Sequence, residues 1–393
     1  MRETVRVCVP RILQIGKSSL DLLPDVLARI GGANRPLVVT DKVMVSQGIA
    51  DRVRERLAER NIRCAVFDGV IPDPTDEVVL AGLAALEAGG HDSVIGLGGG
   101  SPMDAAKAIA VMARHPRDLL FYRPPREFDT PGLPMVAVPT TAGTGSEVTH
   151  HTVIVHAETR EKISCRGEAF VPAAAIVDYE LTLSKPRRLI ADNALDTLTH
   201  AIESYVSRKR SVFSDRMALD CMRLVGTYVQ QAYDDVEDHE AREHLMLAAT
   251  LGGLAFSNAS ICLVHAMSRP LGSLFHVPHG LSNAMLLPTV TEFSTGAAMD
   301  RYADCGRAIG LCEVGDDDAL AVRKLIDGLY AYNARLEVPS MRAFGIDWND
   351  FSDALDQMAE DALRSGAPNN NPRIADKDEI IALFLQAWSA GDD

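Results

Sequence analysis

Residues 93–113 read SVIGLGGGSPMDAAKAIAVMA, an apolar run joined to a helix-like stretch by three consecutive glycines. Ser93–Leu97 predicts a buried strand, and the spacing of apolar residues after Pro102 predicts a helix. Ser101 is expected to cap this helix, with Asp104 completing a capping box. A helix N-terminus behind glycine amides suits a phosphate group. The segment therefore indicates either a nucleotide-binding turn of an α/β fold or a tight turn without a ligand.

The alternation of strands and helices extends on both sides of this turn. Strands are predicted at Pro36–Thr40, Cys64–Phe67 and Pro134–Val138, and helices at Ile49–Glu59, Glu77–Glu87 and Met103–Ala113. Strands separated by helices at this spacing pair in parallel, so residues 1–187 are expected to form an α/β domain with a Rossmann-like parallel sheet.

Strand patterns stop after about residue 187. Helices are predicted at Arg188–Val206, Arg216–Gln231, Glu240–Arg269, Met285–Phe293 and Asp378–Trp388. The helix breakers are expected to be Pro270, Pro278 and Pro288. Residues 188–393 are therefore expected to form an all-α C-terminal domain.

The composition excludes several classes of protein. Of the 393 residues, 47% are hydrophobic and 24% are charged, which is typical of a globular enzyme and excludes disorder and coiled coil. No apolar stretch approaches the roughly 18 residues that span a bilayer. A net charge of −15 argues against nucleic acid and anionic membranes as partners. The seven cysteines include no CxxC pair, which predicts reduced thiols and a cytoplasmic location.

A second donor-rich turn, VPTTAGTGSEVT at residues 138–149, follows the next predicted strand. Ligands bind at the carboxyl ends of parallel strands, so two such turns together predict a dinucleotide or phosphorylated ligand. Asp41 follows an earlier strand, where a carboxylate would accept from ribose hydroxyls and favour NAD over NADP. A plain turn or capping role for Asp41 is the alternative.

The C-terminal half contains a candidate metal site. Asp196 and His200 are four residues apart on a predicted helix, which places both side chains on one face. His265 lies in an apolar helix, and His279 lies at a bend between a proline and a glycine. One aspartate and three histidines suit Fe²⁺ or Zn²⁺, although an ion pair or cap is the alternative for the first two residues.

These segments together resemble the iron-containing (group III) alcohol dehydrogenase family. The resemblance extends over nearly the whole chain and rests on Gly98–Asp104, Pro139–Glu147, Asp196-x-x-x-His200-Ala201-x-Glu203 and Pro278–Gly280. It implies the dehydroquinate synthase-like fold of this family, with an active site in the cleft between two domains. It also implies NAD-dependent hydride transfer between an alcohol and an aldehyde or ketone, and a homodimer or larger assembly.

The resemblance also assigns residues. The metal ligands would be Asp196, His200, His265 and His279. The cofactor would be contacted by Asp41, Gly98, Gly99, Gly100, Ser101, Thr140, Thr141, Thr144 and Lys162, with Asp104 and Ser146 included from the two turns. The metal would act as a Lewis acid on the substrate hydroxyl. Water and His276 are both candidate proton carriers.

The sequence departs from the family pattern in two places. Arg269 replaces a second histidine four residues after the third ligand, and we interpret it as a candidate partner for an anionic substrate group. A cofactor-phosphate contact or an interdomain ion pair is the alternative. Asp73 stands where some members have asparagine, so it is left out of the predicted site. Glycerol dehydrogenase-like or dehydroquinate synthase-like chemistry on the same fold, or a non-catalytic nucleotide-binding protein, are the rival functions.

Overall fold

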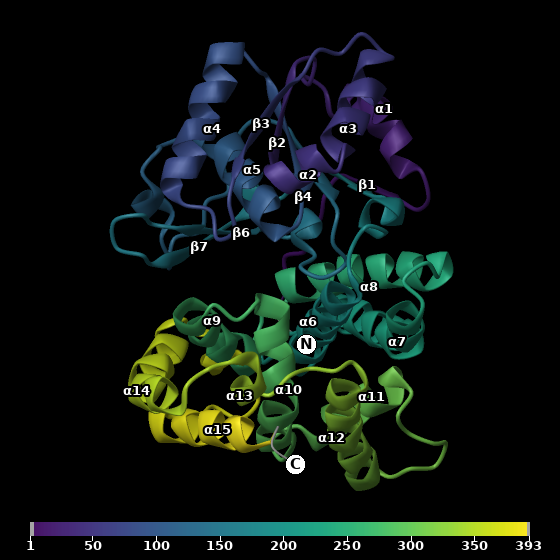
Figure 1. Ribbon diagram of the computed structural model, residues 1–393, viewed down its shortest axis with the longest axis vertical. Helices are drawn as coiled ribbons and strands as arrows, with labels where there is room; N and C mark the ends of the chain where they lie inside the picture. The colour runs from purple at the N-terminus through teal and green to yellow at the C-terminus, as the bar shows by residue number, and fades with distance from the viewer. Residues whose placement is uncertain (1–3, 391–393) are drawn as a thin grey trace. The chain divides into compact units, whose positions relative to one another are not determined.

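The computed structural model describes residues 4–390, and the chain divides into two compact units. The first unit is Arg6–Ser184, and the second begins at Lys185. Figure 1 shows the strands of the first unit and the helices that make up the second. No helix within residues 4–390 has the length and apolarity needed to cross a membrane.

The first unit contains a six-stranded parallel sheet in the order β1-β8-β5-β4-β2-β3. The strands are β1 Ile12–Ile15, β2 Pro36–Asp41, β3 Ala65–Val70, β4 Ser93–Gly98, β5 Met135–Pro139 and β8 Ala174–Val177. Both β4 and β5 are buried along their whole length, as expected for central strands covered on both faces. The four predicted strands and the parallel Rossmann-like sheet are confirmed.

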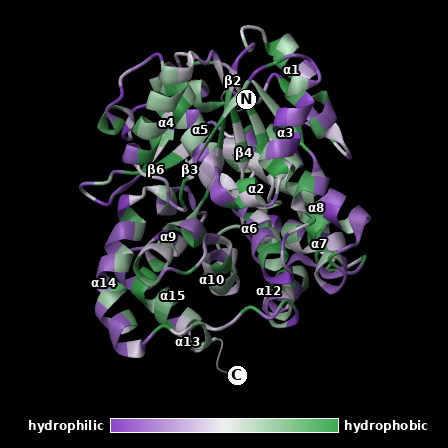
Figure 2. Ribbon diagram, turned by 45° about the horizontal axis from the view of Figure 1, so that its top comes forward, coloured by the Kyte–Doolittle hydropathy of each residue, from purple (hydrophilic) through white to green (hydrophobic). Residues whose placement is uncertain are grey.

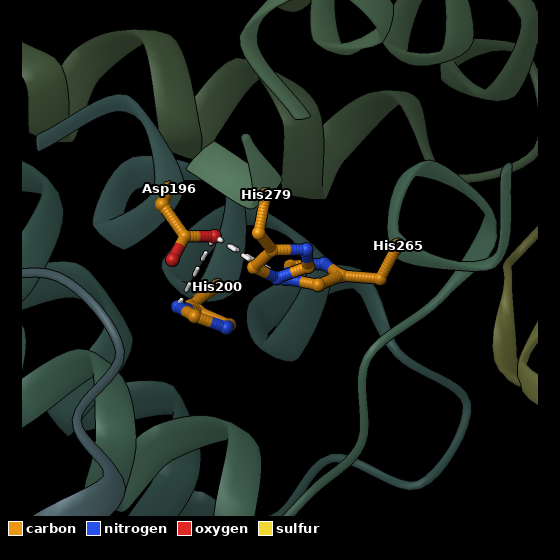
Figure 3. A group of neighbouring side chains, drawn as sticks. All are labelled: Asp196, His200, His265 and His279. Carbon is orange, nitrogen blue, oxygen red and sulfur yellow. Dashed lines mark ion pairs between the residues drawn. The ribbon is translucent and has the colours of Figure 1, made fainter. Parts of the chain in front are cut away.

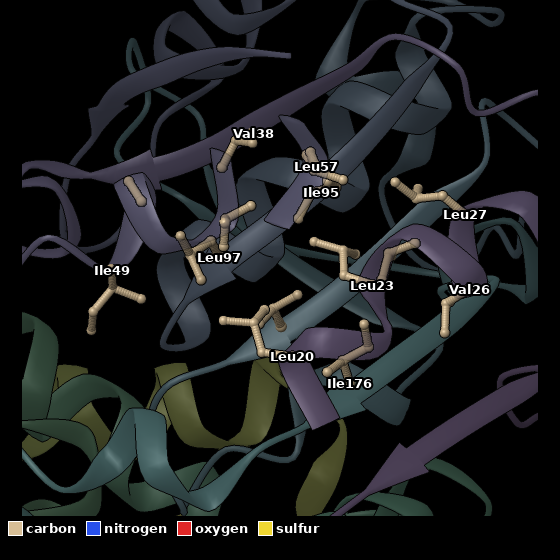
Figure 4. Close-up of a cluster of buried hydrophobic side chains, with 14 of the residues drawn as sticks. Leu20, Leu23, Val26, Leu27, Val38, Ile49, Leu57, Ile95, Leu97 and Ile176 are labelled. Carbon is tan, nitrogen blue, oxygen red and sulfur yellow. The ribbon is translucent and has the colours of Figure 1, made fainter. Parts of the chain in front are cut away.

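Helices cover the two faces of this sheet. They are α1 Leu23–Ile30, α2 Lys42–Ser46, α3 Ile49–Ala58, α4 Asp76–Gly89 and α5 Gly100–Met112. Figure 4 shows the core on one face, where Leu23 and Leu27 of α1 and Leu57 of α3 pack against Val38 and Ile95 of the strands. Burial of this apolar surface is the main source of stability for the unit.

Gly96 explains how α5 packs so closely on the other face of the sheet. A Cβ at this position would lie 2.8 Å from Met135 Cε and 2.9 Å from Ala106 Cβ. The glycine is therefore required by packing between strand and helix. A two-stranded antiparallel hairpin, β6 His151–Val155 and β7 Lys162–Arg166, lies outside the main sheet and was not predicted.

Regular structure in the second unit is entirely helical over residues 185–390. The helices are α6 Arg187–Val206, α7 Val212–Asp234, α8 His239–Ser257, α9 Leu263–Phe275, α10 His279–Thr295, α11 Met299–Ile309, α12 Asp318–Arg335, α13 Met341–Phe344, α14 Trp348–Arg364 and α15 Lys377–Ser389. Figure 2 shows polar residues along much of α14, as expected for a helix with one solvent-facing side. The all-α prediction is confirmed.

Two sequence predictions for this unit were wrong. The single helix Glu240–Arg269 is broken, because α8 ends at Ser257 and α9 begins at Leu263. Asn258 turns its side-chain amide back to Leu254 O at 2.9 Å, which is a local bond that competes with helix continuation.

Pro270 and Pro288 lie inside α9 and α10 and do not end them. Pro288 has no backbone N–H to donate to Ala284 O. That carbonyl instead accepts from the side-chain amide of Asn333 at 2.7 Å. Only Pro278, which precedes α10, acts as a helix boundary.

Candidate functional site

Four predicted metal ligands converge in the second unit. Asp196 and His200 lie one turn apart on α6, His265 lies on α9, and His279 is the first residue of α10. Their potential ligand atoms all lie within 4.8 Å of one another, and Figure 3 shows the four side chains pointing toward one another. Three of the four are buried, whereas the His279 side chain is 48% exposed. His279 is therefore the most solvent-exposed of the four side chains.

Asp196 Oδ1 is the common neighbour of the three imidazoles. It lies 3.9 Å from His200 Nδ1, 3.6 Å from His265 Nε2 and 3.7 Å from His279 Nε2. These distances are too long for hydrogen bonds. The arrangement is therefore a set of lone-pair donors around a common centre.

The electrostatics of the group favour a cation. Burial lowers the pKa of His200 to about 3, so its imidazole is neutral and able to act as a ligand. Burial acts to raise the pKa of Asp196, but the surrounding imidazoles outweigh it and hold that pKa below its usual value. Burial acts to lower the pKa of His265, yet Glu203 and Asp196 raise it to about 9, so a cation would displace a proton there.

The residues fit a divalent transition metal. His200 Nδ1 is buried and has no hydrogen-bond partner in the part of the chain that the structure describes. A buried polar atom without a partner is costly, and a metal ion would satisfy it. One carboxylate oxygen with three imidazole nitrogens is a donor set that both Fe²⁺ and Zn²⁺ accept.

Sequence reasoning missed Asn283, which lies four residues after His279 on α10. Its side-chain amide donates to Asp196 Oδ1 at 2.7 Å and lies 3.2 Å from His265 Nε2 and 3.3 Å from His279 Nε2. The signal available in the sequence was an amide four residues, or one helical turn, after a predicted ligand, and the structure shows that this amide is fully buried. Glu203 belongs to the motif that begins at Asp196, but its role was not predicted from the sequence. In the structure its carboxylate bonds to His265.

The glycine turn of the first unit begins its helix earlier than predicted. The N-cap residue is Gly99 and α5 begins at Gly100, so Ser101 and Asp104 are not a capping box. Gly98 has φ of +142°, and a Cβ there would lie 2.7 Å from Pro102 Cγ. Because the glycines themselves make the turn, the backbone reaches the helix without a side-chain cap.

The second turn lies directly beside the first. Thr140 N donates to Gly98 O at 2.9 Å, and a Cβ on Gly99 would lie 3.4 Å from the Thr141 side chain. The hydroxyls of Thr140 and Thr141 are buried, and neither has a hydrogen-bond partner within residues 4–390. Thr144 Oγ1 accepts from Ser146 N at 3.3 Å. Two buried hydroxyls without partners between adjacent turns indicate a polar ligand.

Asp104 and Ser146 are bonded to each other beneath the turns. Ser146 Oγ donates to Asp104 Oδ1 at 3.1 Å, and Val153 N donates to the other carboxylate oxygen at 3.1 Å. Burial raises the pKa of Asp104 to about 6 and lowers the pKa of Lys107 to about 8. Lys107 Nζ donates to Thr149 O, Thr149 Oγ1 and His151 O at 2.8–2.9 Å. These bonds hold the second turn against α5.

Asp41 lies toward the far end of the same sheet edge, and Lys162 of the hairpin strand β7 pairs with a residue that follows the neighbouring strand. Asp41 ends β2 and caps α2 by accepting from Met44 N at 2.9 Å. Lys162 Nζ pairs with Asp73 Oδ1 at 2.9 Å, and Asp73 follows β3, the neighbour of β2. The sheet order β5-β4-β2-β3 therefore places the threonine turn, the glycine turn, Asp41 and Asp73 in sequence along the carboxyl edge.

His276 and Arg269, the two residues predicted to act in catalysis, both belong to the α9 region. Arg269 is half-buried, one turn after His265. His276 is exposed and ends α9 with a left-handed backbone, φ of +56°. A left-handed backbone at a non-glycine residue is strained, which is common near functional sites.

Two family models match the chain in succession. The model "Iron-containing alcohol dehydrogenase" matches residues 10–179, and "Fe-containing alcohol dehydrogenase family, C-terminal" matches residues 190–388. Among relatives, 1,3-propanediol dehydrogenase of Klebsiella pneumoniae is 36% identical over 97% of this chain and 98% of its own length. NADPH-dependent butanol dehydrogenase of Clostridium saccharobutylicum is 34% identical over 97% of each. The crystal structure of a 1,3-propanediol oxidoreductase matches with a TM-score of 0.94 at 34% identity, covering 98% of this chain and 100% of that one.

Proposed function

We propose that this chain, which belongs to the iron-containing alcohol dehydrogenase family, holds its metal with Asp196, His200, His265 and His279. Family membership confirms the resemblance inferred from the motifs. It makes the chain an oxidoreductase that transfers a hydride between an alcohol and an aldehyde. The identity of the four ligands belongs to our proposal, with Fe²⁺ as the metal that the family description indicates and Zn²⁺ as the competitor that the same donors accept.

The observation that carries this proposal is the convergence of one carboxylate and three imidazoles within 4.8 Å. These four side chains would hold a divalent cation, which would supply Lewis-acid stabilisation of negative charge on the substrate oxygen during hydride transfer. The protein's own contribution is to fix the four side chains before the cation binds, with Asn283 bonded to Asp196. In the oxidative direction the substrate also loses its hydroxyl proton, and we assign His276 as the candidate carrier of that proton.

We propose NAD as the cofactor, bound along the carboxyl edge of the parallel sheet. The glycine turn, Gly98 to Ser101, would meet the phosphates, with the hydroxyls of Thr140, Thr141 and Thr144 beside them. Asp41 would accept from a ribose hydroxyl. Asp104, Ser146 and Lys162 complete the proposed set. Relatives include an NADPH-dependent enzyme, so this choice of cofactor needs its own test.

Arg269 is our candidate for recognition of an anionic group on the substrate. A guanidinium binds carboxylate, sulfonate or phosphonate through paired hydrogen bonds. The test compares Arg269→Ala with the wild type on a neutral and an acidic aldehyde of similar size. We expect the loss to fall on the acidic substrate, and equal losses on both would remove this assignment.

The decisive experiment for the function is a panel of alcohols and aldehydes assayed with NAD(H). The protein is stripped with a chelator and then reloaded with Fe²⁺ or with Zn²⁺. We expect the stripped protein to be inactive and the reloaded protein to recover activity. Full activity of the metal-free protein, or activity only in a lyase reaction, would contradict the proposal.

We further propose that the chain forms a homodimer or larger homo-oligomer, occupies the cytoplasm, and consists of domains 1–187 and 188–393. Support for assembly comes from β1, an edge strand of the sheet, with Val5, Val7 and Val9 exposed before it. None of the seven cysteines, all of which lie within residues 4–390, forms a disulfide, which supports a reducing compartment. Light scattering after size-exclusion chromatography tests the dimer, and a monomeric mass at micromolar concentration would overturn it.

A further inference from the structure

Glu203 is a buried carboxylate that binds four donors at the start of α9. It lies on α6, seven residues after Asp196, and is 3% exposed. Its oxygens accept from Cys262 N at 2.8 Å, Val264 N at 2.6 Å and His265 N at 3.4 Å. They also lie 2.6 Å from His265 Nδ1. Three of the four partners are backbone N–H groups, which can only donate, so Glu203 acts here as an acceptor.

This contact fixes the tautomer of His265. Since Glu203 is the acceptor, the proton of the neutral imidazole must lie on Nδ1. The lone pair is then on Nε2, the atom that faces Asp196 Oδ1 at 3.6 Å. The same contact fixes the rotation of the ring, because Nδ1 has to point at Glu203. A neutral histidine binds a metal through the nitrogen that carries no proton.

Glu203 also joins the helices that supply the ligands. The residues Asp196, His200 and Glu203 follow one another at intervals of four and three on α6, and therefore share one face of the helix. Two of them are proposed ligands, and the third holds the first turn of α9, which carries His265. A single helix face thus presents two ligands and sets the position of a third.

We propose that Glu203 is a positioning residue for the metal, which orients His265 and holds its Nε2 ready to bind the cation. The inference rests on the proposed function, because it assumes that His265 is a ligand. Carboxylates that accept from a metal-bound histidine typically change metal affinity by 10–100-fold when they are removed. Glu203 acts through His265 and does not itself contact the cation.

The competing interpretation is that Glu203 only caps α9. It would then satisfy the free N–H groups at the start of that helix, and its loss would lower stability without any specific effect on the metal. A double-mutant cycle separates the two roles, because a positioning effect must depend on the presence of His265, whereas a capping effect does not.

The experiment measures Co²⁺ affinity of the full chain by competition with a chromophoric chelator. The proteins are the wild type, Glu203→Gln, His265→Ala and the double variant, all prepared metal-free. We expect Glu203→Gln to weaken Co²⁺ binding by about 10–100-fold in the wild-type background, and by less than about threefold in the His265→Ala background. The visible spectrum of bound Co²⁺ should also shift in Glu203→Gln.

Asp178→Asn is the matched control. Asp178 is also a buried carboxylate that accepts backbone N–H groups, from Leu20 and Glu180, but it lies in the first unit. We expect it to lose stability without losing Co²⁺ affinity. If Glu203→Gln does not fold, Glu203→Asp keeps the charge while withdrawing it by one methylene, and the same cycle is run with that variant.

The possible results distinguish the inference from the function on which it rests. Equal losses of affinity in both backgrounds, or no loss in either, would overturn the positioning role of Glu203. A wild-type protein that binds no Co²⁺ would instead overturn the proposed metal site, and with it the proposed function.

Discussion

The proposed metal group and the proposed cofactor turns are built on opposite principles. The metal group takes four side chains from three helices, and Asn283 and Glu203 hold these side chains through buried hydrogen bonds. The cofactor turns are two continuous segments that offer backbone amides and several hydroxyls side by side. The free energy of metal binding should therefore come from a few groups, whereas the free energy of cofactor binding should be spread over many. Loss of one side chain should be severe in the metal group and mild in the turns.

The largest effect is expected for His200→Ala. This change removes a buried, proposed ligand whose Nδ1 has no hydrogen-bond partner within the described residues. We expect the metal content to fall and kcat/KM to drop by about a thousandfold, because Lewis-acid stabilisation is worth several kcal/mol. Metal analysis and an NADH absorbance assay measure both.

His244→Ala is the matched control for His200→Ala. His244 stacks on Tyr228 and does not belong to the group that could hold a metal. We expect this variant to retain its metal and its activity. Unchanged activity in His200→Ala itself would show that the second unit does not concentrate its chemistry in these four ligands.

The next largest effect concerns the stability of the first unit, which contains the proposed cofactor turns, at low pH. Burial, followed by the positive charges of Lys107 and Arg166, lowers the pKa of His150 to about 4. The folded pKa lies below the unfolded value near 6.5, so His150 stabilises the fold above pH 6.5, and this contribution is lost as the pH falls through 4. Between pH 7.5 and pH 4.5, the free energy of unfolding of His150→Gln should therefore fall by about 2–3 kcal/mol less than that of the wild type. Urea unfolding at the two pH values measures this difference.

Asp104 changes the free energy of unfolding in the opposite direction over part of this pH range. Its pKa in the folded protein, about 6, lies above the ordinary value, so its contribution to the stability of the fold is lost as the pH rises. The difference between wild type and His150→Gln isolates the histidine from that background. A wild-type curve parallel to that of His150→Gln would contradict the prediction.

The sequence predicted what depends on local pattern. Strands β2 to β5 and helices α3, α4 and α5 of the first unit follow from apolar periodicity and from glycines that end β4. Strands β1 and β8 and helices α1 and α2 were not predicted. The proposed metal ligands were chosen from the spacing of Asp196 and His200 and from the family resemblance, and the structure brings their side chains together. What the sequence did not show depends on partners far along the chain. Pro288 remains within a helix because Asn333, 45 residues later, donates to the freed carbonyl.

The same limit applies to Glu203 and Asn283, whose roles were not predicted, and to the partner of Lys162. Glu203 meets His265 across 62 residues, and Asn283 meets Asp196 across 87. Lys162 pairs with Asp73 across 89 residues. A motif shows that such polar residues are present, but only the packed structure shows which donor each one meets. Helices α11, α12 and α14 were not predicted either, although each has a buried apolar face.

A smaller effect is expected for Thr140→Val in the second turn. Valine has nearly the shape of threonine but lacks the hydroxyl, which has no hydrogen-bond partner among the described residues. The unfolding free energy of the cofactor-free protein should stay the same or rise by up to about 1 kcal/mol, while the Kd for NADH should rise about fivefold. Chemical unfolding and fluorescence titration measure the two quantities.

Thr182→Val provides the opposite pattern. The Thr182 hydroxyl donates to Tyr179 O at 2.7 Å, so its removal should lower stability without affecting NADH affinity. If Thr140→Val also lost stability and left the Kd unchanged, its hydroxyl would have a structural role. The idea that the turns spread cofactor binding over many donors would then lose its main support.

The smallest effect is expected for Asp73→Asn, at the edge of the cofactor region. Asp73 pairs with Lys162 at 2.9 Å in a partly exposed ion pair, so its carboxylate neutralises a cation beside the proposed ribose site. Removing the charge should release Lys162 toward a 2′-phosphate and raise the NADPH-to-NADH ratio of kcat/KM by about threefold, the size expected for one exposed pair. The gain should vanish in the double variant with Lys162→Ala, and Asp68→Asn, an exposed carboxylate on β3, should not show it. An unchanged ratio in Asp73→Asn would leave Asp41 as the main barrier to NADPH. The choice of cofactor would then be concentrated in a single side chain, just as metal binding is concentrated in a few.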